Sequence, residues 1–284
     1  MTDYSIPIVV GPGSQPPDSD GAEMDFIKMP SGMTTYEQPF IPEADEITGL
    51  EKAIELSYTI INTLENYKAS EKAIIIELDH LDDKNRLFFD QLLGEGEVSV
   101  QSNGQIDALI QESVLAGVWR VQYIDQHKQI TRDTIEVGII PSIVSETTFA
   151  NASDNVDINQ HKIPQSAYNA PPLLTEINDK LKNNSNDQSS HVINLSLLPH
   201  TEEDIILLSD CLGIGPIIIL SRGYGNCRIS STTTKNVWWV QFFNSQETLI
   251  LNTIEICKVP SVACASQEDI DDSAERLIEI LSIY

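Results

Sequence analysis

Three cysteines are the side chains in this sequence best suited to hold a metal ion or an iron–sulfur cluster: Cys227, Cys257 and Cys264. Zinc and iron–sulfur sites use thiolate ligands and commonly draw them from closely spaced pairs such as Cys-x-x-Cys. The sequence contains no such pair, and Pro260 separates Cys257 from Cys264. We therefore expect no metal and no cofactor. A metal or iron–sulfur carrier that uses these three residues is kept as the alternative.

A polar segment at residues 221–228, Ser-Arg-Gly-Tyr-Gly-Asn-Cys-Arg, could contact a partner. Gly223 and Gly225 favour a tight turn, because glycine accepts backbone conformations that other residues avoid. An ordinary β-turn is one interpretation of this segment. The functional interpretation is a contact loop that presents cations and an aromatic ring from an acidic protein, namely Arg222, Tyr224 and Arg228.

Catalytic motifs are missing from the sequence. It has no Gly-x-Ser-x-Gly elbow, and no Ser/His/Asp arrangement stands out from the abundant carboxylates. The pairs Gly94/Gly96 and Gly213/Gly215 follow predicted helices and precede predicted strands, whereas a dinucleotide fingerprint runs from strand to helix. We expect these glycines to form structural turns, and we expect a protein that is not an enzyme.

The overall charge limits the classes of partner. The 284 residues include 43 acidic and 17 basic side chains, which gives a net charge of −26. Such a chain repels nucleic acids and anionic membranes, so we expect neither as a partner. Acidity for solubility alone is the other interpretation. We find no signal peptide and no apolar run of about 20 residues that could span a membrane, and we expect a cytoplasmic protein.

The sequence contains an internal duplication, which appears when the chain is shifted along itself by about 119 residues. Leu93-Gly94-Glu95-Gly96 then aligns with Leu212-Gly213-Ile214-Gly215. Val118-Trp119-Arg120-Val121 likewise aligns with Val237-Trp238-Trp239-Val240. Roughly fifteen of about fifty ungapped positions are identical, where chance would give about three. We therefore predict two related units.

Each copy predicts the same α+β order: a short strand, an amphipathic helix that ends at glycine, and three or four strands that form a mostly antiparallel sheet. The first copy's predicted elements are residues 73–78, 82–93, 97–101, 108–114, 118–123 and 134–140. The second copy's are residues 192–197, 202–212, 217–221, 227–233, 237–242 and 253–259. Thr201 and Asp204 resemble a capping box at the start of the predicted helix 202–212.

Composition outside the copies completes the predicted organisation. Residues 1–46 are rich in Pro, Gly, Ser and acidic residues and are expected to be an irregular segment. The first α+β repeat is assigned to 47–144, with an additional helix at 47–67, and the polar stretch 145–170 to a linker. The second repeat is assigned to 171–284, with flanking helices at 171–181 and 270–280.

Strand alternation places Trp119 and Trp238 on one face of the predicted sheet and Arg120 and Trp239 on the other. One face must be core, so one tryptophan in each copy is expected to be structural. We select Trp239 as the candidate for an exposed aromatic anchor at an interface, and Arg120 as a further candidate for partner contact.

Eight segments, which extend over nearly the whole chain, carry a resemblance to a known family. They are Gly11–Pro16, Leu92–Ser99, Gly117–Val121, Gly223–Ile229, Asn236–Gln241, Ile254–Pro260, Gln267–Ile270 and Asp272–Leu277. In combination these segments resemble the HupH/HyaF family of hydrogenase expression/formation proteins.

The resemblance implies a role in the maturation of a membrane-bound uptake [NiFe]-hydrogenase. It points mainly to the small subunit, which carries iron–sulfur clusters and a twin-arginine export signal, and to other maturation proteins as partners. It supplies no catalytic residues. Our leading hypothesis is a binding chaperone whose acidic surface holds the basic signal or an incomplete small subunit. The alternative is a carrier or protector that uses Cys227, Cys257 and Cys264.

Overall fold

The structure is a computed structural model that describes residues 48–158, 161–183, 190–223 and 225–282. The predicted segment 1–46, with its Gly11–Pro16 motif, and Tyr224 lie outside these residues. Within them the structure confirms the α+β class and the duplicated order of elements.

The first unit consists of α1 (Glu51–Asn66), β1 (Ile74–Glu77), α2 (Asp83–Leu93), β2 (Val98–Ser102), β3 (Ala108–Glu112), β4 (Val118–Ile124), β5 (Ile130–Val137) and α3 (Ser142–Thr147). The second consists of α4 (Ala170–Asn183), β6 (His191–Asn194), η3 (Leu195–Leu197), α5 (Glu202–Leu212), β7 (Ile217–Ser221), β8 (Asn226–Ser231), β9 (Val237–Phe243), β10 (Leu249–Ile256), η4 (Ser261–Ala263) and α6 (Gln267–Leu281).

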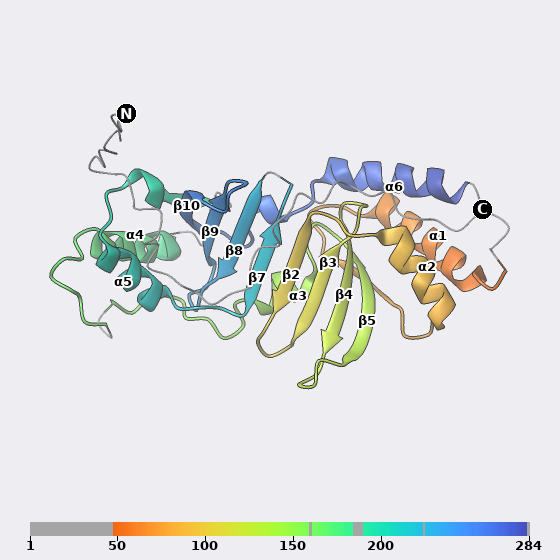
Figure 1. Cartoon of the computed structure of the whole chain (residues 1–284), viewed down its shortest axis with the longest axis horizontal. Helices are drawn as coiled ribbons and strands as arrows, with labels where there is room; N and C mark the ends of the chain where they lie inside the picture. The colour runs from red at the N-terminus through yellow and green to blue at the C-terminus, as the bar shows by residue number, and fades with distance from the viewer. Residues whose placement is uncertain (1–47, 159–160, 184–189, 224, 283–284) are drawn as a thin grey trace, which may run out of the picture.

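The two units share one ten-stranded sheet, an arrangement that the sequence left open. The strand order is β1-β5-β4-β3-β2-β7-β8-β9-β10-β6, and every neighbouring pair is antiparallel. Strands β1 to β5 of the first unit correspond in order to β6 to β10 of the second, so the sheet has the same order of equivalent strands when it is followed from either edge. β2 and β7 pair at its centre, with Val100 opposite Ile219. The duplication therefore produces one pseudo-symmetric sheet (Figure 1).

The hairpin turns show how closely the two halves correspond. In the first, the Asp125 side chain accepts backbone hydrogen bonds from residues 127 and 129 at 2.8 and 2.9 Å. In the second, Asn244 accepts the same two bonds from residues 246 and 248, both at 2.9 Å. Lys128 and Glu247 then adopt φ values of 59° and 61°. Both are uncommon for residues other than glycine, so the turn geometry itself is duplicated.

Helix starts are duplicated as well. Thr201 and Asp204 form the predicted capping box at the start of α5. Asp204 Oδ1 also accepts a bond from the Ala170 N–H of α4 at 2.8 Å. In the first unit Asn85 takes the matching place, because its Oδ1 accepts from the Ala53 N–H of α1 at 2.9 Å. In each unit one buried side chain thus ties the first helix to the second.

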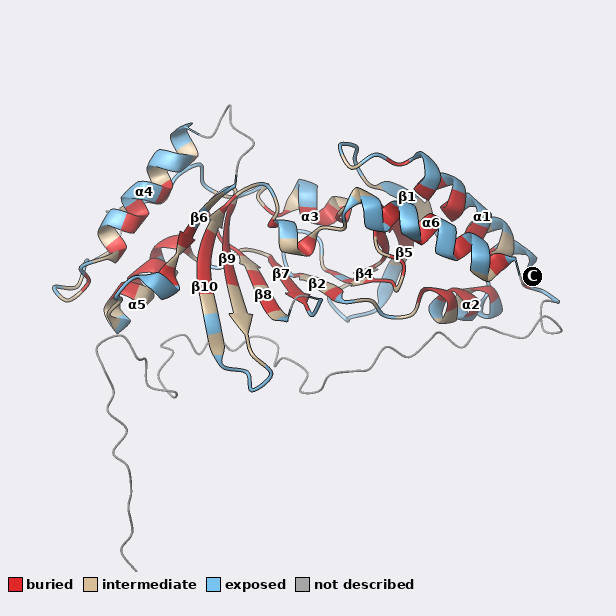
Figure 2. Cartoon of the chain, turned by 90° about the horizontal axis from the view of Figure 1, so that it is seen from above, coloured by how far each residue is buried: buried red, intermediate tan, exposed pale blue. Residues whose placement is uncertain are grey.

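Three hydrophobic clusters cover the two faces of the sheet. One face, which we call the helical face, carries α1, α2 and α6 over the first unit and α4 and α5 over the second. The opposite face, called the shared face, carries Trp119 and Trp238 in one cluster with strands from both units, α3 and η4. Figure 2 shows the helices turning their buried sides to the sheet. The shared cluster makes the halves one packed body.

Each unit sends a segment onto the other. Helix α6 belongs to the second repeat in sequence, yet it packs on α1 at the far end of the molecule from β10 (Figure 1). Ile270 is fully buried there, against Gly117. Conversely, Ser153 forms a parallel bridge with Thr234, and Val156 lies in the cluster of the second unit.

The stretch 145–170 was expected to be a linker between the two repeats. Its described residues instead include the end of α3 and the segment that packs on α4. They connect the units as part of the core, and α6, the last helix of the second repeat, packs on the first unit.

Candidate functional site

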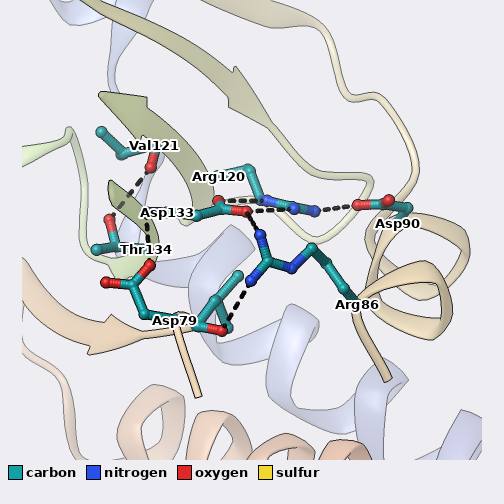
Figure 3. A network of polar contacts seen from close by, with 8 residues as sticks. Asp79, Arg86, Asp90, Arg120, Val121, Asp133 and Thr134 are labelled. Atoms are coloured by element: carbon teal, nitrogen blue, oxygen red, sulfur yellow. Dashed lines mark hydrogen bonds and ion pairs between the residues drawn. The ribbon is translucent and has the colours of Figure 1, made fainter. Parts of the chain in front are cut away.

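The candidate contact residue Arg120 lies at the centre of an ionic network on the helical face (Figure 3). Its guanidinium donates two hydrogen bonds to Asp133 of β5, at 2.8 and 2.7 Å. It also pairs with Asp90 of α2. Arg86 approaches the same Asp133 carboxylate, with a distance of 3.6 Å between Nη1 and Oδ2. Asp133 is almost completely buried, so the two arginines neutralise a carboxylate inside the fold.

This geometry gives Arg120 a structural role. Burial lowers the pKa of Arg120, but the hydrogen bonds and charges of Asp133 and Asp90 outweigh it and leave that pKa above its ordinary value. Its donors are directed at α2 and β5, not at solvent. Arg120 therefore fastens the helix to the sheet.

Trp239 is buried, which contradicts the expectation of an exposed aromatic anchor. Only 7% of its surface is accessible, and its Nε1–H donates to Asn252 Oδ1 at 2.5 Å. Trp239 and Asn252 occupy the positions that Arg120 and Asp133 hold in the first unit. α4 and α5 cover the helical face here as α1, α2 and α6 cover it in the first unit. The prediction was wrong because both faces of the sheet are core.

The predicted contact loop lies at the junction of the two units. The Arg222 N–H donates to the Glu97 carbonyl oxygen at 3.0 Å, across the β2–β7 pair. Gly223 lies so close that a Cβ atom there would stand 2.1 Å from a Glu97 carboxylate oxygen. Arg222 is exposed, and Gly225 has a φ of 101°. Gly223 and Gly225 thus lie between the paired strands β7 and β8, and Arg222 remains a candidate contact.

Arg228 follows this loop on β8 and is partly buried. Its guanidinium lies 5.9 Å from the centre of the Phe243 ring. Burial lowers the pKa of Arg228. Arg228 and Arg120 stand in one row across the sheet, on the helical side, with Gln111, Ser99 and Leu220 between them. The two arginines are therefore four strands apart, at about 19 Å, and do not form one site.

The glycine pairs form the expected turns. Gly94 and Gly213 end α2 and α5 with φ values of 53° and 63°, and their ψ values of −161° and −177° lie in a region open essentially to glycine alone. A Cβ on Gly96 would stand 2.2 Å from the carbonyl oxygen of Ser113. One on Gly215 would stand 2.6 Å from the matching backbone oxygen.

A buried carboxyl that the sequence analysis did not single out lies beside the junction. Glu112 ends β3 and is 8% exposed. The Gly117 N–H is 3.4 Å from its Oε1. Burial, with smaller contributions from the charges of Glu97 and Asp269, raises the pKa of Glu112 to about 7. No pattern marked this residue, because its counterpart in the second copy is Ser231.

The cysteines are thiols within or beside the shared core. Burial raises the pKa of Cys227 and Cys257 to about 12 and that of Cys264 to about 11, so none is poised as a thiolate. Across the described ranges, which include all three, no group of three or more His, Cys, Asp or Glu side chains could hold a metal ion. The geometry therefore offers the carrier alternative no ligand set.

Comparison with known proteins identifies relatives that match nearly end to end. A hydrogenase expression/formation protein, HoxQ of Cupriavidus necator, is 43% identical over 99% of this chain and 98% of its own length. HupH of Rhodobacter capsulatus, with the same description, is 40% identical over 97% and 96%. The hydrogenase-1 operon protein HyaF of Escherichia coli is 30% identical over 96% and 94%.

The family model for the C-terminal conserved region of the HupH hydrogenase expression protein matches twice, at residues 51–157 and 167–284. The two matches coincide with the two units of the fold. Within the part of the chain that the structure places, no helix is long and apolar enough to cross a membrane. The chain belongs to the HupH/HyaF family of hydrogenase expression/formation proteins.

Proposed function

We propose that the protein is a cytoplasmic, non-catalytic accessory factor in the maturation of an uptake [NiFe]-hydrogenase. It binds the iron–sulfur small subunit before that subunit is exported by the twin-arginine route, and it works alongside other maturation proteins. The observation that carries this proposal is the family membership, because the relatives are hydrogenase expression/formation proteins and match this chain over almost its full length.

The surface of the first unit supports binding of a basic partner. Helix α6 buries one side against α1 and exposes the other (Figure 2). The exposed side carries the carboxylates Glu268, Asp271, Asp272, Glu275 and Glu279. The ion pairs found among the described residues involve none of them. A row of carboxylates that no cation of the described residues neutralises attracts a positively charged segment at long range and accelerates its encounter.

Copurification tests the proposal. The full chain, tagged and expressed in cells that make the hydrogenase, should capture the small subunit at low salt. Raising the ionic strength from about 0.05 to about 0.5 M should release it, because the Debye length falls over this range. If the small subunit is never captured under anaerobic conditions, the proposal fails. Capture that salt does not weaken would show an apolar interface in place of the acidic one.

A charge-reversal variant locates the surface. Replacing Asp271, Asp272 and Glu275 by lysine should slow association by at least tenfold, with little change in dissociation. The matched control makes the same charge change at exposed positions of the second unit, Asp179, Asp210 and Glu247. Equal effects of the two triple variants would show that only the net charge matters, and not the face of α6.

A further inference from the structure

The duplication places a carboxylate at one equivalent position in each half of the sheet. Glu136 on β5 stands opposite Trp119 of β4, and Glu255 on β10 stands opposite Trp238 of β9. Both lie on the shared face, because both tryptophans belong to its cluster. Both also face an edge strand, with Ile75 of β1 opposite Glu136 and Val192 of β6 opposite Glu255.

In the first unit this carboxylate is satisfied from within the chain. Glu136 is fully buried and accepts a bond from the Ser142 N–H at 2.7 Å. The Tyr123 hydroxyl lies 3.4 Å from its other oxygen. Arg132 places its guanidinium 4.9 Å from the centre of the Tyr123 ring and pairs with Glu77, at 3.1 and 3.2 Å. A cation stacked on an aromatic ring therefore closes the site.

In the second unit the same positions have lost both the cation and the hydroxyl. Leu251 replaces Arg132, and Phe242 replaces Tyr123, at identical strand register. Asn194 stands where the first unit has Glu77. The carboxylate, Glu255, is retained. The second unit thus keeps one of the two carboxylates and the aromatic ring, and it lacks both the cation and Glu77, the carboxylate that pairs with that cation in the first unit.

Glu255 has no partner among the residues that the structure describes: no hydrogen bond or ion pair to its carboxylate occurs there. It is partly buried, and burial raises its pKa. A part-buried carboxylate without a cation is costly and gains from any cation that reaches it. The site is accessible from the sheet edge, because Val192 on the outermost strand is 50% exposed and Phe242 and Leu251 are partly exposed.

We propose that Glu255 and Phe242 of the second unit receive an arginine side chain from a protein partner. The guanidinium lies over the Phe242 ring, as that of Arg132 lies over Tyr123, and Glu255 takes the part of counterion that Glu77 has in the first unit. Arginine suits the site better than lysine, because its flat guanidinium both stacks on a ring and donates two parallel bonds to a carboxylate. The identity of that partner, the small subunit, rests on the proposed function; the site itself does not.

A titration of the full chain with N-acetylarginine amide tests the site without the partner. The Val192 methyl resonances should shift and saturate at millimolar ligand. N-acetylcitrulline amide, which has nearly the same shape and no charge, should produce at least tenfold weaker binding. Glu255→Gln should abolish the saturable shift. So should Leu251→Arg, because the new side chain fills the site from within the chain as Arg132 does. Ile250→Arg adds the same charge at a neighbouring, 59% exposed position and should bind like the natural chain.

The inference is overturned if the natural chain gives no saturable shift. It is also overturned if Glu255→Gln, whose fold circular dichroism can verify, binds the arginine probe as well as the natural chain. Small-subunit capture by these variants separates the two proposals. Glu255→Gln and Leu251→Arg should lose capture of the small subunit, whereas Ile250→Arg should capture it as the natural chain does. Capture by all variants alike would refute the arginine site and leave the proposed function standing, whereas capture by none, with the probe still bound, would refute only the proposed function.

Discussion

Replacing Glu112 by glutamine should stabilise the protein at neutral and alkaline pH. Burial raises the pKa of this carboxyl from 4.5 to about 7. At 1.36 kcal/mol per pKa unit, the ionised form costs the folded state about 3 kcal/mol. Glutamine has the same shape and keeps an oxygen near the Gly117 N–H, but it cannot ionise.

The sign of the pH dependence follows from the raised pKa. Below about pH 4.5 Glu112 is protonated in both the folded and the unfolded chain, and ionisation costs nothing. As the pH rises towards 7, the unfolded chain releases its proton first, so the folded state loses stability. Above pH 7 the whole penalty of about 3 kcal/mol is present.

Urea unfolding of the natural chain and of Glu112→Gln from pH 5 to pH 8.5 measures directly the free-energy penalty for ionising Glu112. The difference in free energy of unfolding should grow in favour of the variant and level off above pH 7. Glu268→Gln, at an exposed position of α6, is the matched control and should give a flat difference near zero. A flat profile for Glu112→Gln, or a difference that shrinks as the pH rises, would refute the assignment of a buried carboxyl with a raised pKa.

Three further substitutions test the packing. Asp133→Ala leaves Arg120 and Arg86 without their buried counterion and should lower the free energy of unfolding by about 3–5 kcal/mol. The control Asn252→Ala, at the equivalent neutral position, should lower it by about 1 kcal/mol. Equal losses would contradict the ionic network. Gly213→Ala should cost about 1–3 kcal/mol in the same assay, because its backbone conformation is open essentially to glycine; an unchanged stability would show that the turn relaxes freely. Ile270→Ala removes the fully buried contact of α6 and should cost about 2–5 kcal/mol, measured by thermal unfolding, whereas a loss below 1 kcal/mol would mean that α6 is only loosely docked.

Much of the fold could be predicted because duplication doubles the evidence for each element. The helix that ends at Gly213 and the strand at 217–221 have the predicted bounds. Both depend on local signals, namely a capping residue, a terminal glycine and a run of β-branched residues. Strand β5 begins four residues earlier than predicted, at Ile130, because its polar first half pairs with β4 and shows little apolar alternation.

The position of Trp239 could not be predicted, because alternation assigns a residue to a face but does not say whether that face is covered. α4 and α5 cover Trp239, and α6 crosses to the first unit. The same limit applied to Arg120, whose partners Asp90 and Asp133 come from other elements. Glu112 was missed for another reason, since only its surroundings distinguish it from many exposed carboxylates.

The exchange of segments between the units has a consequence for how the protein is made. Helix α6 follows all ten strands in the sequence, yet its Ile270, Ala274 and Leu277 complete the cluster beneath α1. During synthesis the apolar side chains of the first unit therefore stay exposed to solvent until the ribosome has released α6, which covers them. Such distant pairing slows folding and lengthens the time in which aggregation competes. This hydrogenase expression/formation protein thus has a long-range assembly step in its own folding.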